Sequence, residues 1–140
     1  MMGVTKVMEV QVTVWLIQRP PPQPRTAADG SKVYWEPDLS SAAQYGPIST
    51  IFEADARPAL TPGPSIHHVR KLLREYNEGD FFLWAGGDPA ALFMVGSIVQ
   101  EVAPYGTNFL RWERVMSDGK RTGQGFYIPV RITFREKKDG

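Results

Sequence analysis

Residues 80–104, DFFLWAGGDPAALFMVGSIVQEVAP, constrain the fold more than any other part of the chain. Within this stretch, residues 81–85 are apolar without alternation, a pattern typical of a strand buried on both faces of a parallel sheet. Gly86 and Gly87 then allow the backbone to turn sharply with positive φ angles. The stretch therefore predicts a buried strand that leads through a tight turn into a second element.

That second element is predicted to be a helix over residues 89–103. The carboxylate of Asp88 can accept hydrogen bonds from the first N–H groups of a helix, and Pro89 stands where a helix tolerates proline best. The segment is apolar nearly all round, is too short to cross a bilayer, and stops at Pro104. We therefore expect a core helix in which Phe93→Asp prevents folding, because the charge would be buried without a partner.

Hydrophobic periodicity in the rest of the chain predicts an α/β protein. Strands are expected at residues 7–18, 32–36, 48–53, 108–116 and 125–134, a short helical turn at 38–46, and an amphipathic helix at 65–76. Because the two main helices each connect consecutive strands, they imply right-handed crossovers. Pro129 cannot donate to a ladder, so the last strand is expected at an edge. The prediction is one small Rossmann-like domain over residues 1–140, of two or three layers. It has a short, mainly parallel sheet, an antiparallel C-terminal edge hairpin and two main helices.

Several segments between and beyond these elements are predicted to be irregular. The proline-rich residues 19–31 are expected to form a flexible loop, and residues 117–124 a flexible hairpin loop. The charged tail, residues 135–140, is expected to fray. Ser65 is the expected N-cap of the amphipathic helix.

The composition argues against several classes of function. The chain has no cysteine, which excludes disulfides and thiol chemistry and removes the commonest structural zinc ligands. His67 and His68 are adjacent on the predicted helix, so their side chains diverge by about 100° and do not chelate one metal well. We therefore expect no metal and no cofactor. Since no signal-peptide pattern and no membrane-spanning apolar run is visible, a cytoplasmic protein without a membrane partner is expected.

The strand–turn–helix unit offers one candidate ligand site. A loop that leaves a strand and enters a helix N-terminus can bind an anion or a nucleotide. The predicted site comprises Gly86, Gly87, Asp88, Asp38 and Ser40, with Arg111 nearby. However, two glycines lack the spacing of a dinucleotide fingerprint or a P-loop, and the Asp88 carboxylate would repel a phosphate. The pattern favours a capped turn without a ligand, in which Asp38 and Ser40 also act as caps.

A second candidate site lies in the C-terminal hairpin, where residues 105–140 carry eight basic residues against four acidic ones. The predicted nucleic-acid or partner surface comprises Arg111, Trp112, Arg114, Lys120, Arg121, Tyr127 and Arg131. Arginines interleaved with aromatic residues on a sheet surface can contact phosphates and stack on bases. Because the net charge of the whole chain is only +1, a solvated hairpin is favoured over a nucleic-acid surface.

Five segments in fixed order resemble a group of small uncharacterised proteins of tailed bacteriophages and prophages. The segments are VWLIQ (14–18), PDLSSAAQYGPI (37–48), GDFFLWAGGDPAALFMVGSIV (79–99), NFLRWER (108–114) and YIPVRI (127–132). The chain departs from the group in having Phe93 and Met94 where smaller residues are usual, and in a longer final hairpin. The resemblance implies a phage origin, action in the cytoplasm of a bacterial host and a small accessory role. It carries over no catalytic residue.

Three functional hypotheses follow. The first is a non-catalytic accessory protein that binds a host or phage macromolecule, a homodimer included, because an edge strand with nearby aromatics can pair with another chain. The second is binding of a nucleotide or another anionic small molecule by residues 86–89, for sequestration or catalysis. The third and weakest is nucleic-acid binding through the basic hairpin. No catalytic set is recognisable, which favours a non-enzyme without excluding an enzyme.

Overall fold

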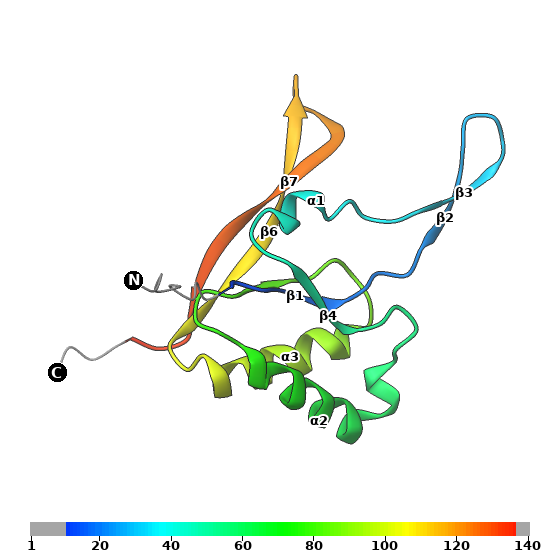
Figure 1. Cartoon of the computed structure of the whole chain (residues 1–140). Coiled ribbons are helices and arrows are strands. Elements are labelled where there is room, and N and C mark those ends of the chain that lie inside the picture. The colour runs from blue at the N-terminus through cyan, green and yellow to red at the C-terminus, as the bar shows by residue number, and fades with distance from the viewer. Residues whose placement is uncertain (1–10, 137–140) are drawn as a thin grey trace, which may run out of the picture.

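The computed structural model describes residues 11–136 and shows a mixed α/β fold (Figure 1). The strands are β1 Val14–Gln18, β2 Gln23–Thr26, β3 Lys32–Trp35, β4 Ile48–Phe52, β5 Phe81–Leu83, β6 Gly106–Ser117 and β7 Lys120–Thr133. The helices are α1 Ser40–Ala43, α2 Pro62–Leu72 and α3 Pro89–Val102, with 3-10 turns at Pro58–Leu60 and Leu73–Glu75. The expected two main helices are α2 and α3.

One five-stranded sheet has the order β4-β1-β5-β6-β7. The pairs β1–β4, β1–β5 and β5–β6 are parallel, and only β6–β7 is antiparallel. The predicted mainly parallel sheet with an antiparallel edge hairpin is therefore confirmed. Strand β5 occupies the centre of the sheet, as expected for the apolar segment on which the prediction rested, and β7, which contains Pro129, forms one edge.

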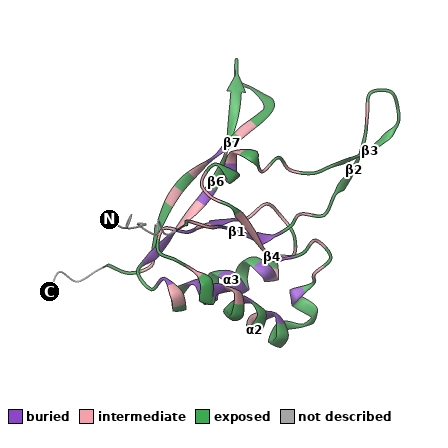
Figure 2. Cartoon of the chain, viewed as in Figure 1, coloured by how far each residue is buried: buried purple, intermediate pink, exposed green. Residues whose placement is uncertain are grey.

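Side chains alternate between two apolar clusters on the two faces of the sheet. Trp15 and Phe82 pack with residues of α2 and α3 on one face. Leu16 and Leu83 pack with Tyr127 and with α1 on the other face. The burial colours of Figure 2 follow this arrangement: purple is concentrated in the central strands and on the sheet-facing sides of α2 and α3. The helical layer is thus on one face, and the smaller α1 covers part of the other.

The buried carboxylate of Asp80 joins the segment before β1 to the start of β5. Asp80 is 0% exposed. Its Oδ1 accepts from the backbone N–H of Thr13 at 2.9 Å. Its Oδ2 accepts from Trp15 Nε1 and from the backbone N–H of Asn77, each at 2.9 Å. The start of two adjacent central strands is therefore fixed by one acceptor group with three donors.

The connection from β1 to β4 carries an arm that projects from the body of the protein (Figure 1). Strands β2 and β3 form a separate two-stranded antiparallel sheet, and every residue in them is exposed. The loop predicted at residues 19–31 is therefore wrong for β2. Pro24 does not prevent pairing there, because each strand of a two-stranded sheet has a free edge toward which a proline can turn. The Arg25 guanidinium, 4.3 Å from the ring centroid of Trp35, adds a cation–π contact across the pair.

Three element boundaries differ from the prediction. Helix α2 begins at Pro62, so Ser65 is buried inside the helix instead of capping it. The loop predicted at residues 117–124 is only a two-residue turn, Asp118-Gly119, in which both residues have positive φ angles; Ser117 ends β6 and Lys120 begins β7. The expected first strand starts only at Val14; residues 1–10, like residues 137–140 of the predicted frayed tail, lie outside the described residues.

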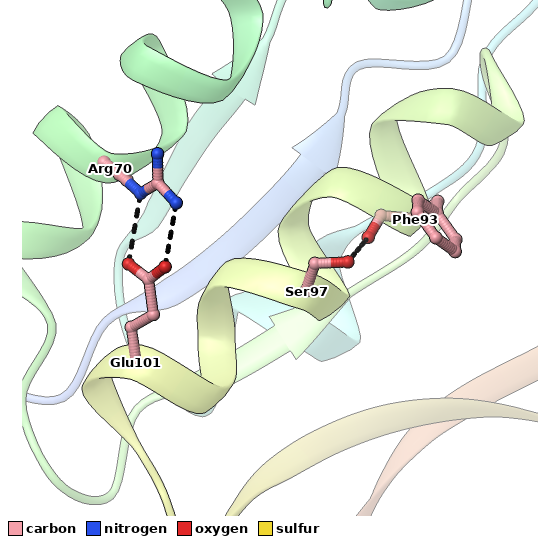
Figure 3. Close-up of polar contacts among 4 residues, drawn as sticks. All are labelled: Arg70, Phe93, Ser97 and Glu101. Atoms are coloured by element: carbon pink, nitrogen blue, oxygen red, sulfur yellow. Dashed lines mark hydrogen bonds and ion pairs between the residues drawn. The ribbon is translucent and has the colours of Figure 1, made fainter.

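Helix α3 is amphipathic, and the prediction that Phe93 lies in the core is wrong. Phe93 is 78% exposed, whereas Val95 is 1% exposed and faces the sheet. Within residues 11–136, α2 is the one α-helix packed beside α3, and the outer side of α3 remains in solvent. Figure 3 shows Ser97 on this outer side, where its Oγ donates to the carbonyl of Phe93, and shows Glu101 accepting two hydrogen bonds from Arg70 of α2. The Arg70 guanidinium lowers the pKa of the Glu101 carboxyl.

The outer edge of β7 is partly occupied by the region of α1. The backbone N–H of Tyr127 donates to Ser41 Oγ at 3.2 Å, and the Tyr45 hydroxyl donates to the Tyr127 carbonyl at 3.0 Å. Two residues on, Pro129 has no N–H to offer. The donors at the middle of this edge are therefore engaged, at Tyr127, or missing, at Pro129.

Candidate functional site

The end of the sheet where ligands usually bind in doubly wound folds is occupied by a side chain of the protein itself. The strand order changes direction between β1 and β5, and such a switch point normally opens a crevice at the carboxyl ends of the strands. Gln18, at the end of β1, is 1% exposed. Its Oε1 accepts from the N–H of Asp88 at 2.7 Å, and its Nε2 donates to the carbonyls of Glu53 and Ala56. Gln18 therefore fills the crevice and satisfies its polar groups.

Replacing Gln18 by leucine should destabilise the protein by about 2–3 kcal/mol, because the Asp88 N–H and the Ala56 carbonyl lose their partner and the Glu53 carbonyl keeps only the Ala56 N–H. The midpoint and slope of urea unfolding measure this change. Gln100→Leu makes the same replacement at an exposed position of α3 and should stay within about 0.5 kcal/mol of the parent. Equal stability of the two variants would show that the Gln18 amide has no structural role.

At the N-terminus of α3 the backbone N–H groups of Asp88, Ala90 and Ala91 are already engaged within the protein. Asp88 Oδ1 accepts from the N–H of Ala90 at 3.0 Å, as the sequence predicted for a cap, and Oδ2 accepts from the N–H of Ala59 at 3.2 Å. Gly87 has a φ of +126°, and a Cβ there would collide with the side chain of Gln18. These contacts describe a closed, capped turn.

An open cleft of about 520 Å³ lies beside this turn, between the base of the arm and the β6–β7 hairpin. Its lining comes from three parts of the chain: the end of β3 with the residues after it, the residues after β5, and the face of the hairpin that carries Tyr127. The lining residues used below are Trp35, Glu36, Asp38, Trp84, Gly86, Trp112, Arg114, Arg121 and Tyr127. A cavity of this size falls in the usual range for small ligands, about 300–1,000 Å³.

The aromatic part of the cleft is held in place by the hairpin. Trp112 and Tyr127 are paired across β6 and β7, with ring centroids 4.9 Å apart and an interplanar angle of 62°. Gly125 lies beneath the indole of Trp112, where a Cβ would collide with the ring. Burial raises the pKa of the Tyr127 hydroxyl, which therefore stays protonated at neutral pH. Trp112 is fixed in position yet 37% exposed.

The charged part of the cleft combines two arginines with two carboxylates. Among the described residues, the ion pairs join Arg19 to Glu53, Arg70 to Glu101 and Arg111 to Glu113. Within residues 11–136, Arg114 and Arg121 thus have no carboxylate partner within 4.0 Å. The Asp38 carboxylate accepts from the backbone N–H of Ser40 at 2.9 Å, and hydrogen bonds from Ser40 lower the pKa of Asp38.

The cleft contains residues from both predicted sites. From the predicted ligand site it takes Asp38 and Gly86, and from the predicted hairpin surface Trp112, Arg114, Arg121 and Tyr127. Ser40, Gly87 and Asp88 lie outside the lining. Three basic residues of the predicted hairpin surface also lie outside the lining. Arg111 points to the opposite face and pairs with Glu113. Lys120 lies at the hairpin turn, and Arg131 lies beside a shallow depression near Tyr105.

Sequence reasoning missed Trp35, Trp84 and Glu36 as lining residues. One signal was present: the chain has only four tryptophans, and three of them line this cleft, while Trp15 alone is buried in the core. Each of the three follows or belongs to a different strand, so only the folded chain brings them together.

The structure is thus that of a small α/β protein with an open aromatic cleft lined by two arginines and two carboxylates. A family model described as phage Pam3 gp32-like protein matches residues 12–131. The chain belongs to this phage protein family, in agreement with the phage resemblance inferred from the sequence. Comparisons with curated proteins and with solved structures gave no match.

Two further searches of residues 11–136 give negative findings. None of the helices described there is long and apolar enough to span a membrane. Within the same residues, no three histidine or carboxylate side chains are grouped in a way that would hold a metal ion.

Proposed function

We propose that this phage protein is a non-catalytic accessory protein that binds a host or phage macromolecule in the cytoplasm of the infected bacterium. The observation that carries the proposal is the cleft itself. Its tryptophans remain accessible, and Trp35 is 42% exposed. Tryptophan and arginine are enriched where proteins bind tightly to their partners.

The two β-hairpins beside the cleft support the same proposal. The arm exposes Tyr34 by 76%, and an isolated two-stranded hairpin gains little stability of its own in water. Such an arm therefore gains most from contact with another molecule. Figure 2 shows the arm and the outer part of the β6–β7 hairpin as exposed.

The second hypothesis is that the protein binds an anionic small molecule. The structure favours the cleft arginines over residues 86–89 as the place where such a molecule would bind. The donors at the N-terminus of α3 are engaged, whereas Arg114 and Arg121 are not paired within the described part of the chain. An anion would find its cationic partners at these two arginines, beside Gly86 and the aromatic rings of the cleft.

Capture from lysate of the infected host tests the proposed function. The protein should retain a stoichiometric partner, and the combined replacement Trp112→Ala, Arg114→Ala and Arg121→Ala should abolish capture. Arg111→Ala removes an arginine from the same strand but from the opposite face, where it pairs with Glu113, and should leave capture unchanged. Failure to capture any partner, or equal capture by the triple variant, would contradict the proposal.

A further inference from the structure

We propose that the cleft binds a nucleotide unit, with its base stacked on the exposed tryptophans and its phosphate held by Arg114 and Arg121. This inference rests on the proposed function, because it names the chemical class of the macromolecule that the cleft receives. That macromolecule is single-stranded nucleic acid. A free nucleotide offers the same groups without being a macromolecule, and the experiment below separates the two sources.

The rings at the cleft suit a flat ligand with two aromatic faces. Trp112 is fixed edge-on against Tyr127 and keeps an exposed surface. Trp35 also lines the cleft and is 42% exposed, with the guanidinium of Arg25 4.3 Å from its ring centroid. Base–aromatic stacking tolerates every base, since each base has a π-face.

The two hairpins beside this cleft carry a net positive charge. Residues 106–133 carry five basic residues against two acidic ones, and residues 19–36 carry three against two. Because the whole chain has a net charge of only +1, the rest of the protein is net negative. An anionic ligand is therefore directed to the two hairpins, and at their junction it meets two guanidinium groups that can form paired hydrogen bonds to phosphate oxygens.

The two carboxylates at the cleft select for a base and against a bare anion. Glu36 and Asp38 accept hydrogen bonds from N–H donors, which the edges of cytosine, adenine and guanine offer and a phosphate at neutral pH does not. In a duplex, pairing occupies one hydrogen of each amino group, and stacking covers both faces of the base. The combination of rings, arginines and carboxylates thus fits one unpaired nucleotide better than a duplex or an inorganic anion.

Fluorescence anisotropy of a labelled oligodeoxycytidylate of about ten nucleotides, a length within known single-strand site sizes, provides the test. The strand should bind more tightly than oligothymidylate, which lacks an amino group. Two phosphate contacts on a single strand predict that affinity falls about sevenfold between about 50 and 200 mM salt. Trp112→Ala should weaken binding by about fivefold or more. Arg114→Ala with Arg121→Ala should weaken binding and remove most of the salt dependence, whereas Arg111→Ala should change neither.

Competition identifies the source of the nucleotide. If deoxycytidine monophosphate displaces the strand at a concentration close to that of the strand itself, the ligand is a free nucleotide; if only longer strands displace it, the ligand is nucleic acid. Both results support the shared chemistry. Equal displacement by inorganic phosphate, or equal binding of a duplex, would overturn it.

Capture from nuclease-treated lysate separates this inference from the function on which it rests. A protein partner that is retained after nuclease treatment, and is lost with the Trp112, Arg114 and Arg121 replacements, would support the proposed function. Combined with no binding of the oligonucleotide, that result would overturn the nucleotide inference alone. Absence of both kinds of binding would overturn the inference and the proposed function together.

Discussion

Asp80→Ala should destabilise the protein by about 4 kcal/mol, a large share of the stability of a typical domain. The replacement removes the acceptors of three hydrogen bonds, from the Thr13 N–H, the Asn77 N–H and Trp15 Nε1, at a site that is 0% exposed. Trp15 Nε1 would stay buried without a partner, and the two backbone N–H groups, which are partly buried, would lose theirs. The free energy of unfolding from urea titration, followed by circular dichroism, measures the effect.

Two further variants serve as comparisons: Asp80→Asn is the conservative replacement at the same position, and Asp55→Asn is the control at an exposed position. The asparagine at position 80 keeps the volume and one acceptor oxygen but turns an amino group toward one set of donors, so a loss of about 2 kcal/mol is expected. Asp55 is exposed, so Asp55→Asn makes the same change of charge with an effect within about 0.5 kcal/mol. If Asp80→Asn behaved like Asp55→Asn, the carboxylate would not hold β1 and β5 together.

Val95→Asp should prevent cooperative folding, whereas Phe93→Asp should change stability by less than about 1 kcal/mol. The two positions are two residues apart on α3, but Val95 is 1% exposed and Phe93 is 78% exposed. A carboxylate at 95 would lie without a partner against the sheet, and one at 93 would lie in water. Thermal melts and gel filtration of both variants compare them directly.

The result for Phe93→Asp reverses the expectation from the sequence, so it also tests the placement of α3. Phe93→Ser serves as a further control, since it removes the ring without adding charge and should fold like the parent. Unfolding of Phe93→Asp alone would show that the outer side of α3 is covered, for instance by a second copy of the chain, as the homodimer hypothesis would require.

Local sequence patterns were sufficient to predict most of the sheet. The unbroken apolar run before Gly86 marked the central strand, and Pro129 marked the edge strand, because burial on both faces and the lack of a donor each leave a direct trace in the sequence. Helix α3 was harder. Because α3 is apolar nearly all round, its sequence does not show which side faces the sheet. The burial of Phe93 depends on whether a second helix covers the outer side of α3, and that is a property of the tertiary structure.

The hairpin turn could have been predicted better than it was. Asp118-Gly119 is a strong signal for a two-residue turn, and weighing it above the surrounding polar residues would have placed Lys120 and Arg121 in β7. The cleft could not be assembled in the same way. Trp35, Trp84 and Trp112 lie on segments whose adjacency depends on the strand order, and the switch-point crevice beside them is filled by Gln18, whose role no local pattern reveals.

The contacts between the region of α1 and the edge of β7 have a consequence for concentrated solutions of this protein. A long edge strand invites uncontrolled sheet growth from one molecule to the next, ending in aggregation. At Tyr127 the backbone N–H and C=O are bonded to Ser41 and Tyr45, and Pro129 offers no donor, so a strand added at mid-edge would find no continuous ladder. The region of α1 thus blocks the addition of a further strand at the middle of β7 while leaving both hairpins exposed.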